Sequence, residues 1–130
     1  MIKCFQNWRF SEYVLDDGAG VITEWIQTLS DEAQAEIDAR LLQWSKLDKW
    51  IEAFAKGFHD LRDLQEISVQ CGGAVYRILG SHISIWEFVM LVGDVDERRR
   101  GKTPPRVKQS ALERLNALRG NPGRRRDYEI

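Results

Sequence analysis

The hydrophobic pattern changes from a helical period to a strand period midway along the chain, and this change constrains the fold more than any other feature. Apolar side chains first recur every three or four positions, then alternate, then form a nearly continuous run. Alternation is typical of a strand with one buried face, and a continuous run suits a central strand buried on both faces. The pattern predicts two helices and then three strands, over residues 21–29, 31–47, 65–69, 74–79 and 85–93.

Elements at the two ends complete this order. Even-spaced apolar residues predict a first strand within residues 2–14, although Gln6 and Glu12 interrupt the pattern. Ser30 is a predicted N-cap. A final helix is predicted to begin with Thr103 as its cap and Pro104 at its first position, and to stop at Gly120. The predicted order, β-α-α-β-β-β-α, is an α+β fold with a small, mostly antiparallel sheet, two N-terminal helices and a C-terminal helix.

The length of 130 residues fits a single domain. We expect this domain to span residues 1–120 and to be followed by a basic C-terminal tail, residues 121–130. For Arg124, Arg125 and Arg126, a solvated and partly disordered tail is an open alternative to a binding role. The chain has no apolar run of transmembrane length and no signal-peptide pattern at its start, so we expect a soluble cytoplasmic protein without a membrane partner.

Charge is distributed unevenly along the sequence. The formal net charge is only -1, but residues 1–70 contain seven basic and thirteen acidic side chains, whereas residues 71–130 contain twelve and seven. Between Arg98 and Arg126 there are eleven basic residues and a single acid, Glu113. This asymmetry predicts an anionic partner for the C-terminal third of the chain.

The segment 98–108 holds the densest group of basic residues and leads into the final helix. Positive charge in the first turns of a helix opposes the helix dipole and costs about 0.3–1 kcal/mol per residue. A bound phosphate would reverse this effect, because the amides at a helix N-terminus attract anions. We therefore predict contact with nucleic-acid phosphates, with plain surface charge as the alternative, for Arg98, Arg99, Arg100, Lys102, Arg106 and Lys108.

Arg77 lies in the middle of a predicted strand, next to Tyr76. A strand arginine on a sheet face needs a partner, because burying it unpaired is costly. One interpretation is a contact with a phosphate or a transition state, with Tyr76 packing or stacking beside it. The other is an internal salt bridge to an acid such as Glu66 or Glu87.

Acid–base and metal chemistry have few candidates. His59 and His82 are the only histidines, each in a predicted loop, and His59 is the better candidate for general acid–base catalysis. Cys4 and Cys71 show no metal-binding spacing. The acidic segment 94–97 contains Asp94, Asp96 and Glu97, but acids next to arginines usually pair with them, so we expect no metal and no cofactor.

Several of these segments together resemble the RelE/ParE toxin superfamily, and in particular its HigB-like, phage-derived branch. The resemblance covers about residues 10–119. The Gly-Gly-x-x-Tyr-Arg and Lys-Thr-Pro-Pro-Arg elements are the most specific part of it. The segments that carry the resemblance are 64–69, 72–79, 88–93 and 102–106.

The resemblance implies a RelE-like fold and a toxin of a type II toxin–antitoxin system. Such a toxin is a metal-independent, ribosome-dependent mRNA endonuclease that a cognate helix-turn-helix antitoxin holds inactive. The resemblance matches Arg77 and the group Arg98–Lys102 to the family's charge-stabilising positions. The predicted catalytic residues are therefore Arg77, Arg98, Arg99 and Lys102, with His59, from the residues alone, as the acid–base candidate. The predicted RNA-binding residues are Tyr76, which matches a residue of the family motif, and Arg100, Arg106 and Lys108.

Two departures from the family pattern leave alternatives open. Ser68 stands where the family strand commonly ends in an arginine, and the acidic segment 94–97 precedes the basic residues that the family places soon after the glycine. The chain is therefore also compatible with a non-catalytic interaction protein on the same fold, which binds gyrase or another host target. A plain RNA-binding module is the third possibility.

Overall fold

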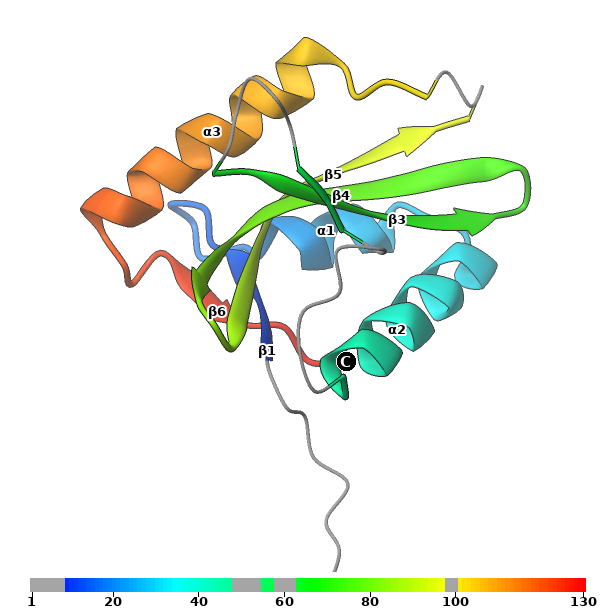
Figure 1. Ribbon diagram of the computed structural model, residues 1–130, viewed down its shortest axis with the longest axis horizontal. Coiled ribbons are helices and arrows are strands. Elements are labelled where there is room, and N and C mark those ends of the chain that lie inside the picture. Colours follow the sequence, from blue (N-terminus) through cyan, green and yellow to red (C-terminus); the bar gives the residue numbers. More distant parts are fainter. Residues whose placement is uncertain (1–8, 48–54, 58–62, 98–100) are drawn as a thin grey trace, which may run out of the picture.

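The computed structural model of the chain describes residues 9–47, 55–57, 63–97 and 101–130. Within these ranges it contains six strands in one sheet, ordered β2-β3-β4-β5-β1-β6, and three helices (Figure 1). Only the β1–β5 pair is parallel among the described pairs of strands. The elements are β1 (Arg9–Tyr13), α1 (Val21–Gln27), α2 (Asp31–Ser45), β2 (Ala55–Gly57), β3 (Gln65–Cys71), β4 (Ala74–Ser84), β5 (Glu87–Asp96), α3 (Pro105–Gly120) and β6 (Arg125–Asp127).

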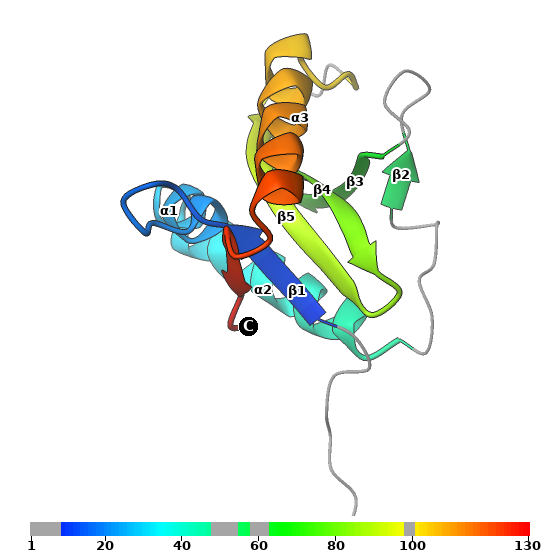
Figure 2. The ribbon, with the colours of Figure 1, turned by 90° about the vertical axis from the view of Figure 1, so that its left-hand side faces the viewer.

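The helices cover the sheet from both sides. Figure 2 shows α1 and α2 on one side of β1 and β5, and α3 on the other. Both α1 and α3 contact β5, which explains why its residues 88–91 are fully buried. The predicted α+β class, with a mostly antiparallel sheet, two N-terminal helices and a C-terminal helix, is confirmed.

The β4–β5 hairpin differs from the sequence prediction. The sequence predicted that the first of these strands ends at residue 79 and that His82 lies in a loop, but β4 continues to Ser84 and the chain reverses at residues 85–86. Gly80 instead lies at a shift in the pairing register with β5, where a Cβ atom would collide with the ring of Phe88 and the carbonyl of Val89. A glycine inside a strand often marks such a bulge or close approach rather than a turn.

The buried carboxylate of Glu12 explains the interruption in the first strand. Glu12 is 1% exposed and accepts hydrogen bonds from the amides of Ile22 and Thr23, at 2.9 and 2.8 Å. It also accepts from the Thr23 hydroxyl at 2.6 Å and from Nε of Arg126 at 3.1 Å. These amides are the ones that a helix start leaves without partners, so Glu12 stabilises the beginning of α1 from the neighbouring strand.

The last ten residues belong to the fold instead of forming a separate tail. Strand β6 pairs antiparallel with β1, and the Tyr128 hydroxyl donates to Asp38 on α2 at 3.0 Å. The arginines of this segment pair with acids from the N-terminal part or the centre of the chain. These ion pairs are Arg124–Asp16 at 2.9 Å, Arg125–Glu87 at 2.9 Å and Arg126–Glu12 at 3.1 Å.

None of the helices within the described ranges is long and apolar enough to cross a membrane.

Candidate functional site

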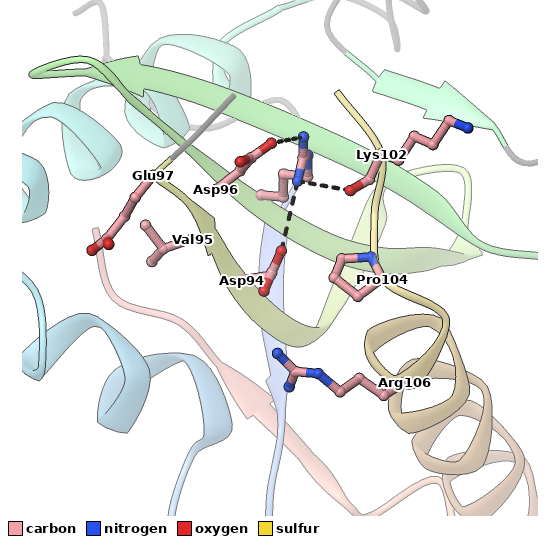
Figure 3. Close-up of a pocket in the computed structure, with 8 residues that line it drawn as sticks. Asp94, Val95, Asp96, Glu97, Lys102, Pro104 and Arg106 are labelled. Atoms are coloured by element: carbon pink, nitrogen blue, oxygen red, sulfur yellow. Dashed lines mark hydrogen bonds and ion pairs between the residues drawn. The ribbon is translucent and has the colours of Figure 1, made fainter. Parts of the chain in front are cut away.

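A polar pocket of about 310 Å³ lies where the end of β5 faces the start of α3 (Figure 3). Strand β5 supplies the acidic side of the pocket, β4 supplies Arg77, and the α3 entry supplies basic side chains. Bound anions or polar groups would therefore meet charges of both signs here. The lining residues are Arg77, Asp94, Val95, Asp96, Glu97, Lys102, Pro104 and Arg106.

Arg77 is buried in this site and faces three carboxylates. Its side chain is only 6% exposed, and its Nη2 lies 2.7 Å from Oδ2 of Asp96. Its Nη1 lies 3.6 Å from Oδ2 of Asp94, and its Nε lies 3.8 Å from Oε1 of Glu66. The pairing with Glu66 is one of the salt bridges that the sequence predicted for Arg77, whereas Glu87 pairs with Arg9 and Arg125 instead.

The alternation of side chains along the strands brings these groups together. Ser68 of β3, Arg77 of β4 and Asp94 of β5 are directly paired across the sheet, so their side chains point to the same face. Glu66 precedes Ser68 by two positions and Asp96 follows Asp94 by two, which places both on that face as well. It is the face that α3 covers.

The same network holds the chain segment that enters α3. The backbone oxygen of Lys102 accepts from Nη1 of Arg77 at 3.4 Å, and the amide of Gly101 donates to Oδ2 of Asp96 at 3.2 Å. The Thr103 hydroxyl donates to Glu66. The prediction that Thr103 caps α3 is therefore wrong, because its hydroxyl is engaged by the sheet; Pro104 holds the N-cap position, and α3 begins at Pro105.

Burial and neighbouring charges shift the pKa of Asp94. Burial raises the pKa of Asp94, and the charge of Asp96 adds to this effect, while Arg77 and Arg106 oppose it. The first turn of α3 has no acidic residue and its N-cap side chain makes no capping hydrogen bond. A carboxylate with a raised pKa beside a positively polarised helix end is an arrangement suited to proton transfer near an anion.

Arg77, Lys102 and Arg106 are the predicted site residues that this pocket brings together. Figure 3 shows the Lys102 side chain extending away from Asp94 and Asp96, and the Arg106 guanidinium lying on the Asp94 side. Lys108 is half-buried on α3 and does not line the pocket.

Tyr76 lies away from the pocket. It precedes Arg77 in β4, so its side chain points to the opposite face of the sheet, where it packs against the hydrophobic core. The predicted site residues His59, Arg98, Arg99 and Arg100 lie outside the described residues.

The sequence contained a partial signal for the acidic partners of Arg77. Asp94 and Asp96 are acids at alternate positions, but the predicted strand ended at residue 93. Only the extension of β5 to Asp96 and its pairing with β4 place them beside Arg77. Among the described residues, no group of three or more histidine, cysteine or acidic side chains could hold a metal ion. The three carboxylates converge on a guanidinium instead.

No protein-family model matches this sequence, and neither the curated proteins nor the solved structures include a match.

Proposed function

We propose that the protein is a RelE-type toxin that cleaves mRNA on the ribosome without a metal ion. The observation that carries this proposal is the pocket at the start of α3, which gathers Lys102, Arg106 and an aspartate with a raised pKa. The resemblance of the strand and helix-entry motifs supports the same activity. The mostly antiparallel sheet, with α1 and α2 after its first strand and α3 after β5, is compatible with the fold that the resemblance implies.

Cleavage through the RNA's own 2′-hydroxyl needs three contributions. A base takes the proton of the 2′-hydroxyl, whose oxygen then bonds to the phosphorus. The bond between phosphorus and the 5′-oxygen breaks, and an acid gives that oxygen a proton. Positive groups stabilise the extra negative charge on the phosphoryl oxygens as the phosphorus becomes pentacovalent. The products are a 2′,3′-cyclic phosphate and a 5′-hydroxyl.

The pocket offers residues for two of these contributions. Arg106, together with Lys102, supplies positive charge beside the amides of the α3 start, and Asp94 is the candidate base because its raised pKa improves its ability to accept a proton. Arg98, Arg99 and Arg100 would add phosphate contacts, and His59 would supply the acid, on the strength of the sequence alone.

The proposed partners follow from this activity. The ribosome and its mRNA are the targets, and a cognate helix-turn-helix antitoxin is the expected inhibitor, by resemblance. Binding of the antitoxin would have to block the pocket or keep the protein from the ribosome.

A second candidate function is favoured by the ion pairing of Arg77. Three carboxylates already face its guanidinium, which leaves it poorly placed to bind a phosphate. A non-catalytic protein of the same fold, acting on gyrase or another host target, would need no free arginine at this position. DNA damage on expression, without any mRNA cleavage, would support this second function.

The proposal can be tested by expressing the protein in a bacterial host and mapping mRNA 5′ ends by primer extension. The wild type should inhibit growth and produce new ends within coding regions. The variant Lys102→Glu/Arg106→Glu should lose both effects, because it reverses two exposed charges of the pocket.

A matched variant controls for charge alone. Arg40→Glu/Lys46→Glu makes the same change at two exposed positions, one on α2 and one just after it, away from the face that α3 covers. This control should cleave like the wild type. Equal cleavage by the pocket variant and the wild type would refute the proposed site.

A further inference from the structure

Arg77 joins the two ends of the chain segment that connects the sheet to α3. Asp96, the last residue of β5, accepts from both Arg77 and the amide of Gly101. Arg77 also donates to the backbone oxygen of Lys102. Dashed lines in Figure 3 mark the contacts of Arg77 with Asp96 and with the Lys102 oxygen. A single buried guanidinium therefore fixes the point where the chain leaves the sheet and the point where it approaches the helix.

Thr103 and Glu66 form a second attachment next to the first. The Thr103 hydroxyl donates to Glu66, and Glu66 lies 3.8 Å from Arg77. Residues 101–103 are thus held to the sheet by three consecutive contacts, through an amide, a carbonyl and a hydroxyl. All three lead back to Arg77 or to one of its carboxylates.

We infer that Arg77 is a positioning residue, which sets the place of Lys102 and Arg106 in the pocket and does not itself contact the phosphate. Two observations carry this inference. The guanidinium is 6% exposed, and its charge is already opposed by three carboxylates. A planar guanidinium suits this task because its several N–H groups can engage a carboxylate and a carbonyl at the same time. The inference rests on the proposed function only where it concerns cleavage.

The substitution Asp96→Asn distinguishes phosphate binding by Arg77 from positioning by Arg77, because the two roles predict opposite changes in mRNA cleavage. If Arg77 bound the phosphate, Asp96→Asn would free the guanidinium and remove a nearby negative charge, so cleavage would stay equal or increase. If Arg77 positions the helix entry, Asp96→Asn weakens the attachment, and cleavage should fall about tenfold or more.

Hydrogen exchange gives a readout that does not depend on RNA. The amide of Gly101 should exchange about tenfold faster or more in Asp96→Asn than in the wild type, because its charged acceptor is lost. The amides of the central strand β5 should keep their protection in the same sample. Their retention shows that the variant is folded.

Thr103→Val is a second variant that changes no charge and leaves no buried ion unpaired. It removes the donor to Glu66 and should also speed exchange at residues 101–103 and reduce cleavage. Thr28→Val is its control, since it removes a comparable hydroxyl, which donates to the Trp25 carbonyl at the end of α1. This control should change neither the hydrogen exchange at residues 101–103 nor the cleavage of mRNA.

The outcomes distinguish the inference from the proposed function. Faster exchange in Asp96→Asn and in Thr103→Val, together with reduced cleavage, supports the inference. Faster exchange in a protein that cleaves no mRNA even as wild type supports the positioning role and contradicts the proposed function. Unchanged exchange in Asp96→Asn together with equal or greater cleavage would overturn the inference, and Arg77 would then be a phosphate contact.

Discussion

At the scale of single residues, buried acids hold several arginines of this protein in place. Glu12 and Glu87 are both nearly inaccessible, at 1% and 4% exposed, and each pairs with arginines of the last strand. Although burial opposes its ionisation, the neighbouring Arg125 and Arg9 help to lower the pKa of Glu87. A buried carboxylate without a partner would be strongly destabilising. These ion pairs therefore stabilise the attachment of the last strand, β6, to the rest of the sheet.

Glu12→Gln should lower the free energy of unfolding by about 2–4 kcal/mol. The amide keeps the size of the side chain, but it loses the charge that pairs with Arg126 and replaces one acceptor oxygen with a donor. It then cannot accept all of the hydrogen bonds from Ile22, Thr23 and Arg126. Urea denaturation followed by circular dichroism measures the change.

Glu24→Gln is the matched control for this experiment. Glu24 lies in the first turn of the same helix but is exposed, so its neutralisation should change the free energy of unfolding by less than about 1 kcal/mol. If Glu12→Gln were as stable as this control, Glu12 would not be the group that stabilises the start of α1.

The alternatives for Arg77 show what the sequence can and cannot predict at a site. A buried strand arginine needs an acid, so an internal salt bridge was predictable, and Glu66 was among the candidates. The sequence could not rank Glu66 above Glu87 as the partner of Arg77, because it does not show that Glu87 lies next to Arg9 and Arg125. The pairing of distant segments decides such questions, and it depends on the assembled sheet.

At the scale of elements, local signals predicted the helices and the central strands better than their ends. Ser30 caps α2 through the Ala33 amide, as its position before two acids indicated. Thr103 carries the same kind of signal, but its hydroxyl is taken by Glu66. The strands β2 and β6 were not predicted, because three-residue strands leave no periodic pattern, and their pairing depends on neighbours distant in sequence.

Gly93→Ala should destabilise the packing of α1 on β5. The indole of Trp25 lies directly over Gly93, and an added Cβ atom would collide with its ring. Because the ring is held against the core, we expect the free energy of unfolding to fall by about 1–3 kcal/mol. Thermal or urea unfolding provides the measurement.

Gly120→Ala makes the same chemical change where no atom would meet the new methyl group. Gly120 is the last residue of α3, so the substitution should leave stability within about 0.5 kcal/mol of the wild type. Equal effects of the two substitutions would show that Trp25 does not pack on Gly93 as described.

At the scale of the whole molecule, the uneven charge along the sequence is largely compensated in space. Of the eleven basic residues between positions 98 and 126, eight lie in the described part of the chain, and at least five of these have partners within the fold. Four of them form ion pairs with acids, and Arg114 donates to the Leu91 carbonyl and lies over the ring of Tyr13. The charge asymmetry of the sequence therefore overstates the positive charge that these five residues offer to an anionic partner, and the sequence predicts phosphate contacts only for the six basic residues of segment 98–108.

The salt dependence of RNA binding should reflect this smaller number. For single-stranded RNA, the logarithm of the binding constant should fall with the logarithm of salt concentration with a slope of about -4 or less steep, as expected for six or fewer phosphate contacts. Engagement of all eleven basic residues would give a slope near about -8. Fluorescence anisotropy of a labelled RNA across a series of KCl concentrations distinguishes the two values.

A reconstituted translation reaction with purified protein tests most directly whether ribosome-bound mRNA is cleaved through its own 2′-hydroxyl. We expect mRNA fragments ending in a 2′,3′-cyclic phosphate, formed only when ribosomes are present. A 2′-O-methyl group at the cleaved nucleotide should abolish the cut. Intact mRNA in the presence of translating ribosomes, or cleavage that persists at the methylated nucleotide, would contradict the proposed function.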